Sequence, residues 1–244
     1  MGTDLLTNLV ASSISFVIGW VFFYLLGLER LVRPTKKLWH IKDPQRLIIC
    51  AATSVRTDTG HYSRPATGVG QLRALGHIVE SLSKAYDVKI HNILLSDDQV
   101  QKQIEDDIIV LGGPKNNVIT KLLLDKINEA RPIANQFGNT IHWLVKGQEM
   151  TVEGTRLDNT VVKDYGLIIR TANPFAKRGN PTAAAIFAGC HTYGTIAAAK
   201  YFTESYIEHA RWFRSIPRNV ALLVECDVID GYPVAIKLLK AHEF

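Results

Sequence analysis

Three polar loops contain most of the residues in this 244-residue chain that could bind a ligand or take part in a reaction. The first, residues 53–71, combines many hydroxyl groups with two arginines and three glycines. The second, residues 112–117, reads Gly-Gly-Pro-Lys-Asn-Asn, and the third, residues 189–195, reads Gly-Cys-His-Thr-Tyr-Gly-Thr. Each loop follows an apolar run and precedes an expected helix, whose free backbone N–H groups favour anions. The loops therefore predict a site for a phosphate- or nucleotide-type ligand.

Side-chain chemistry predicts a role for several members of this site. Arg56, Arg64 and Lys115 would meet phosphate groups. Asn116 or Asn117 would either cap the following helix or contact a base or ribose. The glycines would let the backbone come close to the ligand. The candidate ligand-binding residues are Thr53, Ser54, Arg56, Thr57, Asp58, Arg64, Thr67, Gly68, Gly112, Gly113, Lys115, Asn116, Asn117, Gly189, His191, Gly194 and Thr195.

Each loop also has a purely structural interpretation. A Gly-Gly-Pro sequence after a strand can be only a tight turn, and the loop around His191 can be a capped helix start with close packing. The first loop is the strongest candidate, because irregular loops longer than about 15 residues are uncommon in compact domains unless they are functional. The chain contains neither a P-loop nor a Gly-x-Gly-x-x-Gly fingerprint. Its three cysteines match neither a disulfide framework nor a zinc site, so we expect no metal and no cofactor.

Two further classes of function stay open. An enzyme that cleaves a nucleoside or NAD would need a carboxylate in the pocket, and Asp58 and Glu80 are the candidates for it. Only two histidines, His61 and His191, fall in the candidate loops, and no nucleophile-elbow or His-Glu-x-x-His motif is present. The sequence therefore assigns no catalytic residue. The other alternative is a membrane-tethered scaffold whose loops bind a protein partner.

The elements expected around the loops alternate between strands and helices. We expect strands over 46–52, 88–95, 107–111, 140–145, 165–171, 183–188, 220–228 and 232–239, and helices over 71–86, 98–105, 118–130 and 195–209. Residues 149–159 are expected to form a hairpin or an extended excursion. Such alternation predicts an α/β fold with a mainly parallel, Rossmann-like or flavodoxin-like sheet, flanking helices and a C-terminal β-hairpin. In these folds ligands bind at the carboxyl ends of the strands, where the three loops lie.

An uncharged stretch over residues 5–28 is long and apolar enough to cross a membrane. No basic residue precedes it, unlike in a signal peptide, whereas residues 29–46 carry six basic and two acidic side chains. The positive-inside rule then predicts an N-terminus outside the cell membrane and a cytoplasmic C-terminal domain. We expect a single-pass anchor over 1–28, a basic linker over 29–45 with Trp39 at the membrane interface, and an α/β domain over 46–244.

The formal net charge of +5 is concentrated beside the anchor. This placement predicts contact with lipid headgroups and no nucleic-acid partner, because no basic-aromatic stripe or DNA-binding motif is present.

Two parts of the sequence resemble known families. Residues 108–117, Ile-Ile-Val-Leu-Gly-Gly-Pro-Lys-Asn-Asn, resemble the strand–Gly-Gly-Pro-x-x-Asn–helix unit of archaeal S-layer-like domains and of bacterial cell-wall-binding repeats, and 166–175 with 185–198 follow the same pattern. This resemblance implies an α/β fold, but an extracellular S-layer role does not fit the cytoplasmic side expected here. The plan of one anchor and one Rossmann-like domain is similar to membrane-linked components of bacterial anti-phage nucleotide-signalling systems. That similarity implies a sensor or effector that forms a homo-oligomer and perturbs the membrane through clustered anchors.

Overall fold

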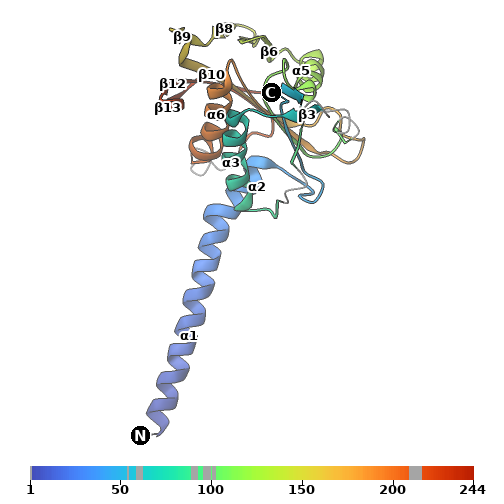
Figure 1. Ribbon diagram of the computed structural model, residues 1–244. Coiled ribbons are helices and arrows are strands. Elements are labelled where there is room, and N and C mark those ends of the chain that lie inside the picture. The colour runs from blue at the N-terminus through green and yellow to red at the C-terminus, as the bar shows by residue number, and fades with distance from the viewer. Residues whose placement is uncertain are drawn as a thin grey trace.

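The computed structural model describes residues 2–53, 55–58, 63–88, 93–95, 100, 103–208 and 216–244. Its helices are α1 (Gly2–Gly27), the π-helix η1 (Leu28–Val32), α2 (Arg33–Trp39), α3 (Val69–Ser83), α5 (Val118–Ala130), α6 (Thr192–Lys200) and the π-helix η3 (Tyr201–Tyr206). Figure 1 shows α1 standing away from a folded body that contains all the strands. The chain is therefore one long N-terminal helix followed by an α/β domain.

The main sheet has the strand order β13-β12-β10-β11-β5-β1-β4, and β9 pairs with β10. Its strands are β1 (Ile48–Ala51), β4 (Ile93–Leu95), β5 (Ile108–Leu111), β9 (Thr155–Leu157), β10 (Thr160–Ala172), β11 (Ala183–Gly189), β12 (Val220–Ile229) and β13 (Tyr232–Glu243). The neighbours β4, β1, β5 and β11 are parallel, whereas β10, β12 and β13 pair antiparallel with their neighbours.

The sheet is therefore mixed, and the expectation of a mainly parallel sheet is wrong. The cause is the short connection between β10 and β11, because a parallel pair needs a crossover of a dozen or more residues, usually through a helix. A Rossmann-like or flavodoxin-like arrangement is accordingly not confirmed. The α/β class and the C-terminal hairpin are confirmed, and the hairpin turns at Asp230 and Gly231, both with positive φ.

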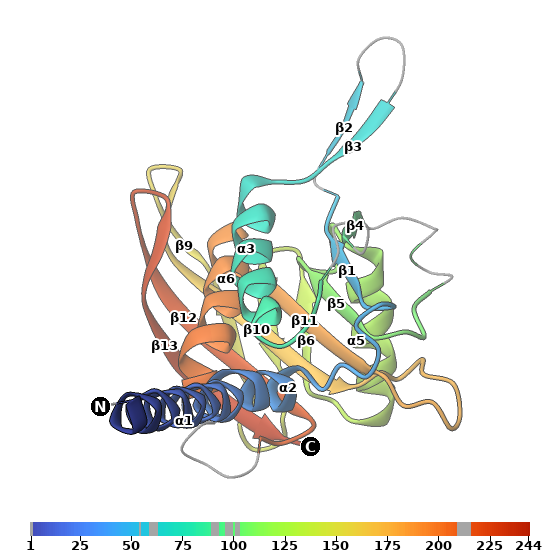
Figure 2. The same ribbon diagram turned by 90° about the horizontal axis from the view of Figure 1, so that it is seen from below.

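Two layers cover the main sheet. One face carries α2, α3 and α6, which bury side chains such as Leu38, Ile78 and Ala198. The other face carries α5 and a small antiparallel sheet of β6 (Ala134–Phe137), β7 (Thr140–Trp143) and β8 (Met150–Glu153). Figure 2 shows α3 and α6 side by side on one face and α5 on the other. The small sheet brings the β6–β7 turn to the edge of the main sheet where the candidate loops lie.

Several local expectations differ from the structure. Residues 53–70 contain a hairpin of β2 (Val55–Asp58) and β3 (Ser63–Ala66), where the sequence predicted no regular structure. Strand β6 was not expected, and α6 begins three residues earlier than expected, because the side chain that caps it lies far away in the sequence, on β10. Much of the helix expected over 98–105 lies outside the described residues.

Helix α2 is part of the folded domain. Trp39 is 1% exposed and packs edge-to-face on Phe202, with 5.3 Å between the ring centroids. Leu38 and Thr35 are also fully buried. The interfacial position expected for Trp39 is therefore wrong, because the domain uses this indole to complete its own core.

Helix α1 makes no comparable contacts. From Leu9 onward, the described chain contains one helix that is long and apolar enough to cross a membrane, and none of its apolar window is buried in the protein. Large apolar side chains such as Phe16 and Phe23 are exposed along it.

Candidate functional site

A pocket of about 190 Å³ lies at the carboxyl ends of β1, β5 and β11. The three loops singled out in the sequence meet there, since these strands are parallel and adjacent. Eight expected residues line the pocket: Gly68, Gly112, Gly113, Lys115, Asn116, Gly189, His191 and Thr195. Six residues outside the expected set complete the lining: Gln71, Gln136, Gly138, Asn139, Cys190 and Thr192. Figure 1 shows β6 and β8 at the end of the domain opposite α1, so this edge faces away from that helix.

The other expected residues have different positions. Thr67 donates its hydroxyl hydrogen to Ala52 O at 2.9 Å, and Thr53 N donates to Asn116 O at 3.1 Å, so both hold the first loop against its neighbours. Ser54 lies outside the described residues, as do the side chains of Arg56, Thr57, Asp58 and Arg64. The backbone of these last four residues belongs to the β2–β3 hairpin, which projects from the body in Figure 2.

Two buried glutamines line the pocket with amide oxygens that lack a partner. Gln71, in the first turn of α3, is 9% exposed, and Gln136, on β6, is 5% exposed. Gln136 Nε2 donates to Gly189 O at 2.8 Å, which fixes the orientation of its amide. Across the described part of the chain, neither Gln71 Oε1 nor Gln136 Oε1 receives a hydrogen bond. Buried acceptors without donors are costly, so these two oxygens mark the pocket as a place for a donor.

Two glycines allow this arrangement. Gly112 has φ +96°, a conformation that other residues rarely adopt, and a Cβ there would lie 2.6 Å from Ala52 Cβ. A Cβ on Gly113 would lie 2.5 Å from Gln136 Oε1. The Gly-Gly pair therefore brings the backbone of the second loop close to the side chains of Ala52 and Gln136.

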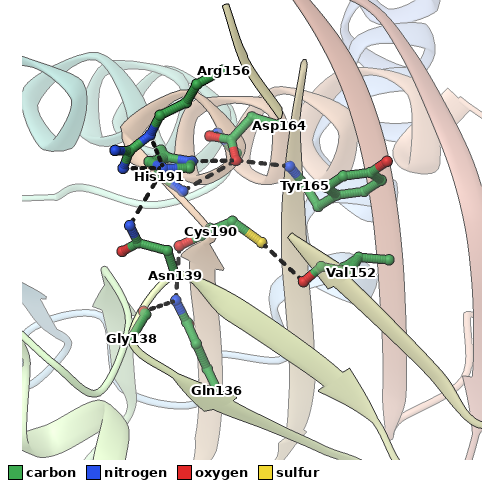
Figure 3. Close-up of polar contacts among 11 residues, drawn as sticks. Gln136, Gly138, Asn139, Val152, Arg156, Asp164, Tyr165, Cys190 and His191 are labelled. Carbon is green, nitrogen blue, oxygen red and sulfur yellow. Dashed lines mark hydrogen bonds and ion pairs between the residues drawn. The ribbon is translucent and has the colours of Figure 1, made fainter. Parts of the chain in front are cut away.

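A buried carboxylate organises the third loop. Asp164, on β10, is fully buried and accepts hydrogen bonds from three backbone N–H groups, those of Tyr165 at 2.9 Å, His191 at 3.1 Å and Gly194 at 2.5 Å. The last two lie at the start of α6, so Asp164 caps that helix from another element. Figure 3 shows this carboxylate facing the His191 ring.

The His191 ring is held from both sides. Its Nδ1 lies 3.3 Å from Asp164 Oδ1, and its Nε2 lies 2.7 Å from Arg156 Nη2 (Figure 3). A guanidinium group only donates, so Nε2 acts as an acceptor and the ring hydrogen sits on Nδ1 facing the carboxylate. A Cβ on Gly154 would lie 2.3 Å from His191 Nδ1, so only glycine leaves room for this contact.

The helix starts of the second and third loops are already capped. Asn117 accepts from Ile119 N at 3.0 Å and Thr120 N at 3.2 Å and is fully buried, so it caps α5 and does not face a ligand. Asp164 fills the same role for α6. The anion-binding expectation for these two helix starts stays a prediction, and at each of them a protein side chain already accepts from two backbone N–H groups. At the start of α3, Gly68 offers no side-chain cap.

Two expected glycines serve packing. A Cβ on Gly194 would lie 1.9 Å from Tyr165 O, and one on Gly189 would lie 2.3 Å from Thr195 N. These contacts let α6 approach the sheet closely. Gly194 is accordingly a packing residue, and Gly189 both packs and lines the pocket through its backbone.

The residues considered for catalysis are not assembled in the pocket. Glu80 lies about two and a half turns along α3 from Gln71, is exposed, and pairs with Lys84 at 3.9 Å. Burial, followed by the Asp164 charge, raises the pKa of the Cys190 thiol to about 12, and its Sγ donates to Val152 O at 3.6 Å. Cys190 is therefore not a nucleophile near neutral pH. His61 and the Asp58 side chain lie outside the described residues.

Sequence reasoning missed the residues that depend on tertiary structure. Gln136 lies on β6, which has no clear periodicity, and Arg156 lies on an exposed edge strand with no distinguishing signal. Asp164 had one signal: it stands directly before the apolar run of a strand, where a carboxylate needs several donors if it is buried. Within the described residues, no group of three or more His, Cys, Asp or Glu side chains is arranged to hold a metal ion.

Comparison with the models of known protein families and with curated proteins finds no match for this chain. The site must therefore be interpreted from its own geometry.

Proposed function

We propose that this protein is a membrane-anchored sensor or effector whose C-terminal domain binds a nucleotide-like ligand in the pocket at the ends of β1, β5 and β11. The observation that carries the proposal is the pair of buried, unpartnered amide oxygens of Gln71 and Gln136 in a pocket formed by three converging loops. A buried polar group without a partner costs stability. Two such groups in one concave site therefore favour a role in binding a ligand.

The pocket volume sets how much of the ligand it encloses. About 190 Å³ is smaller than the roughly 300–1,000 Å³ typical of sites that enclose a whole drug-sized ligand. One part of the nucleotide would be enclosed, and the remainder would extend over the mouth. Lys115 is exposed there and would meet a phosphate, and Arg56 and Arg64 remain candidates for the same role.

The anchor part of the proposal rests on α1. Its exposed apolar side chains, with Phe23 73% exposed, need apolar surroundings, which a bilayer supplies. The basic residues after it favour an N-terminus outside and a cytoplasmic domain. Ligand binding would promote homo-oligomerisation, and the clustered anchors would perturb the membrane. The similarity of this plan to anti-phage nucleotide-signalling components makes phage defence the biological setting that we propose.

The test uses the full chain in detergent micelles, because α2 is part of the domain core. Thermal unfolding is measured with mono-, di- and cyclic nucleotides and NAD, and the mixtures are then analysed by chromatography. A ligand of the folded state adds about 2.7 kcal/mol of stability at a hundredfold excess over Kd. Lys115→Ala should weaken this effect, whereas Lys121→Ala, an exposed lysine on α5 outside the pocket, should not.

Other outcomes would select another function. Stabilisation together with a cleaved product would favour the nucleoside- or NAD-cleaving enzyme, for which the Asp164–His191 pair at the pocket is the one supporting observation. No stabilisation by any nucleotide would contradict the sensor and favour a scaffold that binds a protein partner.

A further inference from the structure

The geometry points to a ligand group with at least two hydrogen-bond donors between Gln71 and Gln136, such as the vicinal hydroxyls of a ribose or another polyol, with any phosphate outside the pocket. This inference rests on the proposed function, since it names the part of the ligand that the pocket encloses. It also revises the expectation that phosphate would sit at the helix starts.

Two hydrogen-bond contacts fix the orientation of the Gln136 amide. Gln136 Nε2 donates to Gly189 O at 2.8 Å and lies 3.4 Å from Gly138 O, so both donor contacts of that amide are with backbone carbonyls. Its Oε1 must then face the other way, and it receives no hydrogen bond from any residue that the structure describes. Gln71, from a different element, lines the same pocket, and its Oε1 also receives no hydrogen bond from the described residues. A ligand group that contacts these two oxygens must supply donors to them.

A phosphate group inside the pocket would fit the two glutamine oxygens poorly. An ionised phosphate oxygen only accepts hydrogen bonds, so next to Gln71 Oε1 and Gln136 Oε1 it would face two like dipoles. The side chains of Asn117 and Asp164 already accept from N–H groups at the starts of α5 and α6, and at the start of α3 the N–H groups of Gln71 and Leu72 donate to Gly68 O. In the described lining, the one side chain with a fixed positive charge is the exposed Lys115.

The side chains that line the pocket also do not suit a divalent cation. Calcium and magnesium sites are built from oxygen ligands that include carboxylates. The described lining contains amides, hydroxyls, a thiol, an imidazole and backbone groups but no carboxylate. A neutral, hydroxyl-rich group therefore fits the chemistry of the pocket best.

The pocket volume limits how much of the ligand is enclosed. A volume of about 190 Å³ lies below the roughly 300–1,000 Å³ typical of sites that enclose a whole drug-sized ligand, so the pocket takes one part of a nucleotide. The sugar is the part that offers neighbouring hydroxyl donors to the two glutamine oxygens.

The test measures affinity of the full chain in micelles by calorimetry. The probes are ribonucleoside 5′-monophosphates, their 2′,3′-dideoxy counterparts, inorganic phosphate, ribose and myo-inositol. The inference predicts that loss of the two hydroxyls weakens nucleotide binding about tenfold or more, and that inorganic phosphate alone binds much more weakly. Gln71→Leu should remove most of this preference, while Gln148→Leu, an exposed glutamine outside the pocket, should leave it unchanged.

The outcomes separate the inference from the proposed function. Equal binding of ribo- and dideoxynucleotides would overturn the inference and leave the nucleotide-binding function standing. Binding of ribose or myo-inositol that depends on Gln71, with no binding of nucleotides, would contradict the proposed nucleotide-binding function and support the inference. Binding of none of the probes would overturn both. Thermal unfolding of each variant shows whether it is folded, and Gln71→Leu is the preferred variant because the Gln71 amide oxygen has no hydrogen bond to lose.

Discussion

The indole N–H of Trp39 donates a hydrogen bond to the hydroxyl of Ser81, with 3.1 Å between Nε1 and Oγ. Ser81 lies in the last turn of α3, and the first turn of this helix carries the pocket residue Gln71. Trp39 also packs on Phe202, in the π-helix that continues α6, and α6 begins at the pocket residue Thr192. Two helices therefore join the pocket to the C-terminal end of α2.

Removing the Trp39 side chain should destabilise the whole domain. Trp39→Ala leaves a large cavity between Phe187 and Phe202 and an unpaired Ser81 hydroxyl, and such changes cost about 3–5 kcal/mol. Chemical unfolding of the full chain in micelles measures this loss. Trp20→Ala, on the exposed part of α1, is the matched control and should leave the domain unchanged. Equal effects of the two substitutions would contradict the packing of α2 into the core.

The same packing predicts the outcome of truncation. A chain that begins at residue 46 lacks Leu38 and Trp39 and should melt well below one that begins at residue 28, since two fully buried side chains are missing. Differential scanning calorimetry of the two fragments measures this. Equal melting temperatures would show that α2 is dispensable.

Gly154→Ala should displace His191. The added methyl would lie 2.3 Å from His191 Nδ1 and 3.0 Å from Asp164 Oδ1, so the ring must move and the capping carboxylate is disturbed. We expect a loss of about 1–3 kcal/mol in stability and weaker ligand binding. Gly76→Ala, in α3 with open space around it, should instead gain about 0.5–1 kcal/mol. A neutral Gly154→Ala would contradict the close contact.

The cysteines should resist modification in the folded protein. Burial raises the pKa of Cys190 and of Cys226 to about 12, so at pH 8 only about one thiol in ten thousand is the reactive thiolate. Iodoacetamide labelling followed by mass spectrometry should find both unmodified until denaturant is added. Rates should rise with pH, because the thiolate fraction grows tenfold per unit below the pKa. Ser83→Cys, at an exposed position, provides a reactive comparison, and fast native labelling of Cys190 would contradict its burial.

Arg170 should tolerate an apolar replacement. Its guanidinium is fully buried, donates to Pro217 O, and leaves Nε and Nη1 without a partner among the described residues. Burial lowers the pKa of Arg170 to about 10, which reflects the cost of the buried charge. Arg170→Met should therefore keep or raise the melting temperature, whereas Arg170→Ala should lower it by creating a cavity. A large loss in Arg170→Met would show that the guanidinium makes a stabilising interaction.

The elements that the sequence predicts well are those whose signals are local. The apolar runs of β1, β5 and β11 and the Asn117 cap of α5 lie within a few residues of the elements they define. The direction of β10 depends instead on where the chain goes after it leaves the strand. Its short return to β11 makes the pair antiparallel, which no periodicity in residues 160–172 encodes.

The candidate site shows the same difference between residues with local sequence signals and residues that depend on tertiary structure. Glycines and polar residues at strand ends predicted the three loops that line the pocket, because parallel strands bring their carboxyl ends together. The partners of these loops from other elements were not predictable, since Gln136 contacts the third loop from β6 and Asp164 contacts it from β10. The Asp164 carboxylate accepts from N–H groups at the start of α6, where the sequence predicted an anion.

Affinity selection tests most directly whether the pocket binds a nucleotide-like ligand. The full chain in micelles is incubated with an equimolar mixture of ribonucleotides, separated from unbound material, and its retained ligand identified by native mass spectrometry. We expect one nucleotide to be retained by the unmodified chain and by Gln148→Leu but lost from Gln71→Leu. Retention of no nucleotide, or equal retention by Gln71→Leu, would contradict it.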